Sequence, residues 1–509
     1  MEDLIQRLAA WPTIVSTLLL AIVLSYVRTR LRPGLRKVPG PFLASISDLD
    51  RIWSCAKGNQ MFYHLALHEQ YGRIVRVGTN HVSLSDCALI PQLYGISSKF
   101  TKSSFYNMFD IKTPKGEAIP TIFSTRDEVQ HKEVRRRVAN AYSLSSLKEL
   151  EPMNDACSAI FLRKLDGLVG KDIDLGTWLH WYAFDVITSI TFSNRLDFME
   201  QEKDVDHIIE AIESRLIYNS IIGQAPYLHK YIFGSPLVSW IASFIPSLAV
   251  MNSSRFIVAF AAKQLQRYQD SKTNVSELSD LLNRFKRFKD GEQTMSDAEL
   301  LTHATSSIFA GSDTTAASLR AIFYYTCRNP SVHAKLLAEI DAADKAGQLS
   351  DPVTFAEAQN LKYFQAVIKE ALRMHPAVGL LLERKVPAGG AEVGGMWLPE
   401  GTVVGINPWV AARDKEAYGQ DAWDFRPERW LEADEKQLKL MERNFLAFGS
   451  GTRTCIGKNI SLLEMSKLVP QLLRRFDFGL SDPRKEWVLH DYWFVKQSGL
   501  ICKVKQRHS

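Results

Sequence analysis

FGSGTRTCIG, from Phe448 to Gly457, places three glycines, an arginine and a cysteine within ten residues. A phosphate-binding loop would need four residues between its glycine and the closing Gly-Lys, followed by Ser or Thr. Here five residues separate Gly451 from Gly457-Lys458, and Asn459 follows. Both the spacing and the last residue therefore argue against nucleotide binding.

The cysteine of this stretch is expected where a loop enters a helix. Residues Ile456 to Phe476 have helical spacing of apolar side chains. Unpaired N–H groups and the dipole at a helix N-terminus favour a thiolate at Cys455, and Arg453 offers donors for a carboxylate. A thiolate beside Phe448 suits the axial ligand of a haem iron. The spacing is equally compatible with an entry loop that merely buries a cysteine.

Length, composition and charge limit the possible domain organisation and function. The chain has 509 residues, 46% hydrophobic and 23% charged, without repeats or long linkers, which favours one large globular domain over residues 45–509. The net charge of +6 is modest and its cations are dispersed, so nucleic-acid binding is not indicated. The six cysteines form no C-x-x-C pair, which argues against zinc-ribbon and dithiol sites and favours a reducing compartment.

The N-terminus has the pattern of a membrane anchor. Leu8 to Val27 carries no charge and, as a helix, is long enough to cross the hydrocarbon layer. Basic residues follow it, which predicts a cytosolic body; a cleaved signal peptide is the alternative. We therefore expect an anchor over residues 1–30, a basic, proline-containing hinge over 31–44, and a single-pass protein of the endoplasmic reticulum membrane.

The body is predicted to be mostly helical with a small β region. Arg73–Asp86 and Gly394–Trp409 have the pattern of two hairpins. Asp297–Arg328 is the longest helix candidate, with Ser296 and Glu299 placed as a capping box. Leu361–Met374 is a further helix, ended by His375-Pro376.

Four stretches together resemble the cytochrome P450 family of haem-thiolate monooxygenases. FGSGTRTCIG is similar to its haem-binding signature, and Glu370–Arg373 (EALR) to its E-x-x-R helix motif. Pro427–Trp430 (PERW) resembles its P-E-R-F segment, and Ala310–Thr315 (AGSDTT) its oxygen-activation motif. The resemblance covers essentially the whole body, and is strongest to the pisatin-demethylase-like branch of filamentous fungi. It implies the P450 fold and haem b.

The resemblance assigns a role to each motif. The resemblance implies a buried structural cluster of Glu370, Arg373 and Arg429. By spacing alone, Glu370 and Arg373 would be a solvated ion pair on a helix surface. Asp313 and Thr314 become the groups that deliver protons to the reacting oxygen, whereas the alternative is a tolerated kink with hydroxyls bonded to carbonyls. Residues assigned to haem binding are Phe448, Gly449, Gly451, Arg453, Cys455 as iron ligand, Gly457, and the propionate partners His131, Arg135 and Arg384.

A substrate pocket and a redox partner follow from the same resemblance. Lys132, Arg136 and Arg137 are expected to guide a separate NADPH-dependent flavoprotein reductase, because the residues after Cys455 are too few for flavin domains. The predicted pocket residues indicate a bulky lipophilic substrate. They are Phe105, Phe109, Phe123, Phe309, Ala310, Val378, Leu380, Trp493 and Phe494.

The expected reaction is oxidation of that substrate with O2 and electrons from NADPH. The fungal branch often tailors terpenoids, alkaloids or polyketides, so secondary metabolism is the expected setting. Other readings stay open: a haem-thiolate isomerase or dehydratase that works without O2, oxidation of xenobiotics or fatty acids, and a haem-based ligand carrier.

Overall fold

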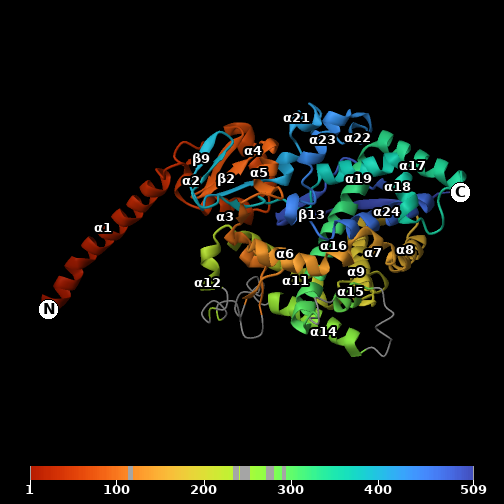
Figure 1. Ribbon diagram of the computed structural model, residues 1–509, viewed down its shortest axis with the longest axis horizontal. Helices are drawn as coiled ribbons and strands as arrows, with labels where there is room; N and C mark the ends of the chain where they lie inside the picture. The colour runs from red at the N-terminus through yellow and green to blue at the C-terminus, as the bar shows by residue number, and fades with distance from the viewer. Residues whose placement is uncertain are drawn as a thin grey trace.

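Helices form most of the protein, as the sequence predicted (Figure 1). The structure is a computed structural model that describes residues 2–112, 118–232, 235, 240, 253–270, 280–288 and 294–507. The longer helices are α1 (Glu2–Arg30), α3 (Leu49–Ala56), α4 (Gln60–Tyr71), α6 (Glu128–Val138), α8 (Glu151–Asp166), α9 (Leu175–Phe192), α11 (Ile208–Gly223), α14 (Ser253–Asp270), α16 (Asp297–Arg328), α17 (Pro330–Lys345), α19 (Lys362–Met374), α23 (Glu435–Asn444) and α24 (Lys458–Arg475).

Short helices connect these elements. They are α2 (Phe42–Ile46), α5 (Ile90–Tyr94), α7 (Leu144–Lys148), α10 (Phe198–Gln201), α12 (His229–Ile232), α15 (Leu281–Arg287), α18 (Phe355–Asn360), α20 (Pro408–Ala411), α21 (Lys415–Tyr418) and α22 (Arg429–Glu432). The 3₁₀ turns that matter for the site are η2 (Ser104–Phe109) and η8 (Gly451–Arg453).

Helix α16 runs through the middle of the body (Figure 1). It begins at the predicted capping box, in which Ser296 and Glu299 exchange side-chain and backbone hydrogen bonds. Buried residues follow along its length, and α9, α14, α19 and α24 pack against it. A helix buried on several sides is a rigid base on which a site can be built.

The weak helix formers in the middle of α16 do not interrupt it. Ser312 Oγ donates to Ile308 O at 3.0 Å, and Thr314 Oγ1 donates to Ala310 O at 2.8 Å. The hydroxyls thus bond back to the carbonyls one turn earlier, which is how Ser and Thr are accommodated inside helices.

Strands form a small region beside the helices. The largest sheet has the order β1-β2-β10-β7-β3, with β2 and β10 parallel and the other pairs antiparallel. The strands are β1 (Ile74–Gly78), β2 (His81–Leu84), β3 (Thr101–Lys102), β4 (Ile111–Lys112), β5 (Ala118–Ile119), β6 (Asp172–Asp174), β7 (Arg384–Lys385), β8 (Ala391–Val393), β9 (Met396–Leu398), β10 (Val403–Ile406), β11 (Phe476–Leu480), β12 (Val488–Tyr492), β13 (Phe494–Ser498) and β14 (Ile501–Gln506).

One of the two predicted hairpins is confirmed and the other is wrong. β1 and β2 pair as expected within Arg73–Asp86. Within Gly394–Trp409, however, β9 pairs with β8, while β10 lies between β2 and β7. All four residues of β10 are buried, which is typical of a central strand with two neighbours. The chain does turn at Gly401, where φ is +72°, but the turn leads from one sheet into another.

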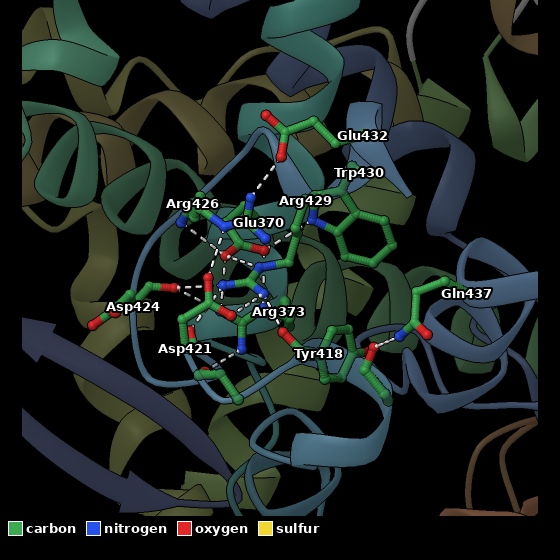
Figure 2. Close-up of polar contacts among 12 residues, drawn as sticks. Glu370, Arg373, Tyr418, Asp421, Asp424, Arg426, Arg429, Trp430, Glu432 and Gln437 are labelled. Carbon is green, nitrogen blue, oxygen red and sulfur yellow. Dashed lines mark hydrogen bonds and ion pairs between the residues drawn. The ribbon is translucent and has the colours of Figure 1, made fainter. Parts of the chain in front are cut away.

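Glu370, Arg373 and Arg429 form a buried cluster that holds residues 412–430, the segment before the cysteine loop (Figure 2). Glu370 and Arg373 on α19 are fully buried and joined by two hydrogen bonds of 2.9 and 2.8 Å. Arg429 donates to Glu370 at 2.9 Å, and Arg373 also donates to Ala412 O, Ala422 O and Asp424 O. The pair is therefore an interior crosslink between a helix and an irregular segment, as the family resemblance implied.

Trp430 completes this cluster in a way the sequence did not reveal. Its indole N–H donates to Glu370 Oε2 at 2.9 Å. Burial favours the neutral acid, but hydrogen bonding from Arg373 and the charges of Arg373 and Arg429 hold the pKa of Glu370 below its ordinary value. The indole supplies a donor that phenylalanine in the usual P-E-R-F segment lacks.

Helix α1 projects away from the body (Figure 1). Arg76 holds its C-terminal end by donating to Thr29 O at 2.8 Å and to Arg30 O at 3.1 Å. Part of the predicted anchor, Leu8–Val27, falls on residues whose side chains lie outside the described ones, namely 1–14 and 18. Within the described part of the chain, no helix has both the length and the apolar character needed to cross a membrane. The anchor stays a prediction.

Candidate active site

An internal cavity of about 350 Å³ lies between α16 and the cysteine loop. It brings together most of the residues that the sequence predicted for haem, oxygen and substrate. The predicted haem and oxygen residues that line it are His131, Arg135, Thr314, Arg384, Phe448, Gly449, Arg453, Cys455 and Gly457. Segments more than 300 residues apart in the sequence therefore meet around one space.

Two glycines shape the cysteine loop. Gly449 and Gly451 have φ of +70° and +63°, a region that L-residues with side chains rarely adopt. A Cβ atom on Gly451 would lie 1.7 Å from Tyr94 O in α5, so no side chain fits there. Gly451 does not line the cavity; it lets the loop pack against α5. Inside the loop, the Cys455 N–H donates to Phe448 O at 2.8 Å.

Cys455 has accessible side-chain surface and lines the cavity, where surrounding protein still buries its thiol. Burial raises the pKa of its thiol above the ordinary value, although the backbone N–H groups of Gly457 and Lys458 and the charge of Arg135 act in the opposite direction. The donors that we predicted are present, but burial outweighs them. A cation at the sulfur is what would hold this group as a thiolate. Among the described cysteines, the other five do not line this cavity.

A group of basic side chains lines the cavity beside the cysteine loop. Arg135 donates to Thr454 O at 2.9 Å, which ties α6 to the loop. Arg453 is held by Glu128 at 2.8 Å and by Thr125 O at 2.9 Å. Burial and the charges of Arg453, Arg135, Lys102 and Arg384 lower the pKa of His131 to about 3, so its imidazole is neutral at physiological pH.

Lys102 belongs to this group and was missed by the sequence analysis. It is buried on β3, where the strand register places it directly opposite Arg384 of β7. Burial and the charges of Arg384 and Arg453 lower its pKa well below the ordinary value. Like charges directly opposite one another on neighbouring strands destabilise a sheet. The site therefore favours an anion placed between them.

These observations fit haem b. The Cys455 sulfur lies in the same cavity as Lys102 and Arg384, two basic side chains that face one another. Haem offers an iron cation for the sulfur and two carboxylates for the basic side chains. Cys455 would hold the iron, and Lys102, His131, Arg135, Arg384 and Arg453 would surround the propionates.

The two residues predicted for proton delivery face different surroundings. Thr314 lines the cavity. Asp313 is not among the described residues that line the cavity. Its Oδ1 lies 2.6 Å from Nε2 of the buried His180 on α9. Burial lowers the pKa of His180, while the hydrogen bond to Asp313 raises it. His180 could be found only from the packing of α9 against α16, since no local motif marks it.

Most of the predicted substrate residues also line the cavity. Phe109, Phe123, Phe309, Ala310, Val378, Trp493 and Phe494 do so. Phe105 and Leu380 do not: both border a second, much smaller void beside Arg51 and Glu383. Phe105 is 2% exposed and packs on Trp493 with ring centres 5.3 Å apart, so it supports the cavity wall from behind.

The residues predicted for reductase docking lie on α6. Arg136 and Arg137 already contact Glu133 at 2.8 and 3.2 Å, and Arg137 also contacts Glu299 at 2.7 Å. Lys132 is exposed. Acidic neighbours within the protein therefore partly neutralise this face of α6, which reduces the charge available to an acidic partner.

Comparison with known proteins identifies the family. The Cytochrome P450 family description matches residues 33–500. Cytochrome P450 monooxygenase cicH of Emericella nidulans is 39% identical over 96% of this chain and 97% of its own length. A cytochrome P450 monooxygenase of Aspergillus terreus is 37% identical, over 94% of this chain and 97% of its own. Cytochrome P450 monooxygenase gsfF of Penicillium aethiopicum is also 37% identical, over 95% of each chain. The chain belongs to the cytochrome P450 family of monooxygenases.

Proposed function

We propose that this enzyme uses O2, and electrons passed from NADPH by a separate flavoprotein reductase, to oxidise a bulky organic molecule in fungal secondary metabolism. The three relatives named above come from Emericella, Aspergillus and Penicillium and are named monooxygenases. We further propose that α1 and its basic flank anchor the protein in the endoplasmic reticulum membrane with the body in the cytosol.

The observation that carries the proposal is the presence of Cys455 and Thr314 in one cavity that basic side chains also line. Haem, when bound, supplies the redox chemistry that activates oxygen, and the protein supplies binding, orientation and proton delivery. Cys455 would supply the sulfur ligand. Lys102, Arg135 and Arg384 would neutralise the propionates and help to hold the group.

Thr314 is the hydroxyl that can hold a proton beside the reacting oxygen. Its Oγ1 donates a hydrogen bond to Ala310 O at 2.8 Å. The same oxygen keeps two lone pairs, which can accept a hydrogen bond from a donor in the cavity. Asp313, the preceding residue, pairs with His180, and neither of these two residues lines the cavity. We propose that protons pass from this pair to Thr314 when the Asp313 side chain turns.

The aromatic lining sets the kind of substrate. Phe109, Phe123 and Trp493 contact one another with ring centres 5.1 to 5.5 Å apart and form one wall of the cavity. Such a wall excludes water from the reaction and favours a flat or branched apolar ligand. Haem-thiolate isomerases and dehydratases tend to lose the Asp-Thr pair, so the presence of Asp313 and Thr314 favours oxygen chemistry.

The proposal is tested by the stoichiometry of the purified enzyme with reductase. Oxygen uptake, NADPH oxidation and product are measured in the same reaction with candidate substrates. Product containing one atom from labelled O2 per NADPH supports a monooxygenase. Product formation without oxygen or NADPH would instead identify an isomerase or dehydratase.

A further inference from the structure

Tyr106 lies where the aromatic wall of the cavity meets the basic side chains beside the cysteine loop. It belongs to η2, is 1% exposed and lines the cavity. Its ring centre lies 5.4 Å from that of Phe123 and 6.0 Å from that of Trp493, and both contacts are edge-to-face. The Nζ atom of Lys102 lies 4.2 Å from the centre of the same ring. Tyr106 therefore contacts both the predicted substrate wall and the basic group.

The turn that carries Tyr106 is tethered to the strand that carries Arg384. Ser103 caps η2, since its Oγ accepts a hydrogen bond from Phe105 N at 3.1 Å, and the same hydroxyl donates to the side chain of Glu383. Glu383 directly precedes Arg384, whose Nη1 donates to Glu383 O at 2.9 Å. The relative position of Tyr106 and Arg384 is thus fixed by contacts of their immediate neighbours.

The hydroxyl of Tyr106 is hydrogen-bonded to the guanidinium of Arg384. A guanidinium has donors and no acceptor, so the Tyr106 oxygen accepts in this bond and its own O–H stays available. No acceptor for that O–H is found among the described residues. Burial raises the pKa of Tyr106 above its ordinary value, although the charge of Arg384 acts in the opposite direction, so the phenol keeps its proton at neutral pH.

A carboxylate matches this set of donors. Lys102 and Arg384 lie directly opposite one another on β3 and β7, and Tyr106 contacts both of them. The two oxygens of a carboxylate offer about four positions for hydrogen bonds, and donors that are charged or bind a charge make the stronger bonds. Because Tyr106 and Arg384 are already bonded to one another, one carboxylate oxygen can contact both side chains.

We propose that the Tyr106 hydroxyl donates a hydrogen bond to a haem propionate and so joins the edge of the haem to the aromatic wall of the cavity. This inference rests on the proposed function, because it takes haem b as the group that the basic side chains surround. It gives the two parts of Tyr106 separate roles. The ring belongs to the wall formed with Phe123 and Trp493, and the hydroxyl belongs to the haem site.

Replacing Tyr106 by phenylalanine tests the role of the hydroxyl, since the ring is kept. In the haem-containing enzyme, resonance Raman spectra show the bending vibration of the propionates, whose frequency rises with hydrogen bonding. This band should lie at lower frequency in Tyr106→Phe than in the wild type. Transfer of haem to apomyoglobin should be about ten-fold faster, because a hydrogen bond to a charged group is lost. An unchanged band overturns the proposal, whatever the transfer rate.

Tyr142→Phe is the matched control. Tyr142 lines the same cavity, but its hydroxyl is 3.3 Å from Oγ of Ser307 on α16. This variant loses the same atom from another part of the wall, so it should keep the propionate band and change the transfer rate less than about two-fold. Equal changes in Tyr106→Phe and Tyr142→Phe would show a general effect of removing a hydroxyl from the cavity, and would overturn the proposal.

A double variant separates direct contact from an effect through Arg384. Arg384→Lys keeps the positive charge but removes the planar fork that binds Tyr106. If the hydroxyl itself binds the propionate, Tyr106→Phe should still speed haem transfer several-fold in this background. No further effect there would show that Tyr106 only positions Arg384, and would overturn the proposal.

These measurements need neither reductase nor O2. A wild-type protein that takes up no haem would overturn the proposed function together with this inference. A haem-loaded enzyme in which Tyr106→Phe changes nothing would overturn this inference alone.

Discussion

Replacing Glu370 by glutamine should destabilise the fold by about 3–5 kcal/mol, because it removes the anion from a buried ion cluster. Glu370 accepts hydrogen bonds from Arg373 Nε and Nη2, Arg429 Nε, Trp430 Nε1 and Arg426 N. Glutamine keeps one oxygen, but its NH₂ group would face donors, and the charges of Arg373 and Arg429 would lose their buried partner.

Urea unfolding followed by the loss of native absorbance measures this change. The matched control is Glu432→Gln: Glu432 belongs to the same region and contacts Arg426 at 2.7 Å, but its side chain is 63% exposed (Figure 2). An exposed pair contributes about 0–1 kcal/mol. A loss below about 1 kcal/mol in Glu370→Gln, or equal losses in both variants, would refute the claim that the buried cluster holds the segment before the cysteine loop.

Glu370 should also make the stability of the fold depend on pH. Burial favours the protonated form, but Arg373 and Arg429 lower the pKa of Glu370 below its ordinary value of 4.5. A group with a depressed folded-state pKa stabilises the fold above its unfolded pKa, and that contribution is lost as the pH falls through the folded value. The free energy of unfolding should therefore decline below about pH 4.5 more steeply in the wild type than in Glu370→Gln.

Further substitutions test other parts of the account. Lys102→Met should weaken haem retention several-fold, because the propionates lose a buried cation; transfer of haem to apomyoglobin measures it, and an unchanged rate would place Lys102 outside the haem site. Gly451→Ala should prevent stable haem incorporation, since its Cβ would lie 1.7 Å from Tyr94 O, whereas Gly479→Ala, with open space around it, should not. Thr314→Val should still consume NADPH but yield several-fold less product, the missing electrons appearing as hydrogen peroxide; unchanged coupling would show that another group carries the protons.

The parts of the fold that depend on local sequence could be predicted. The capping box at Ser296 and the glycine-rich entry to α24 are set by residues only a few positions apart, and the structure places both as expected. The position of Cys455 in a loop before a helix was predictable for the same reason, whereas its role as haem ligand was implied by the family resemblance and stays a prediction. The family resemblance then added the distant partners.

What could not be predicted depends on contacts between distant segments. The pattern of Val403–Ile406 indicated a strand but could not show that its neighbours are β2 and β7. The position of Lys102 beside Arg384 depends on the register of β3 against β7, which local sequence does not show. Tyr106 shows the same limitation: no motif marks it, and its contact with Arg384 follows only from the fold.

The central claim is that the Cys455 sulfur holds a haem iron, and the absorption spectrum of the reduced carbon-monoxide complex tests it most directly. The wild-type protein should show the red-shifted band of a thiolate-ligated haem. Cys455→Ala should lose that band. Cys157→Ala, which removes a buried cysteine outside the cavity, should keep it. A red-shifted band that persists in Cys455→Ala would contradict the assignment of the ligand and of the active site built around it.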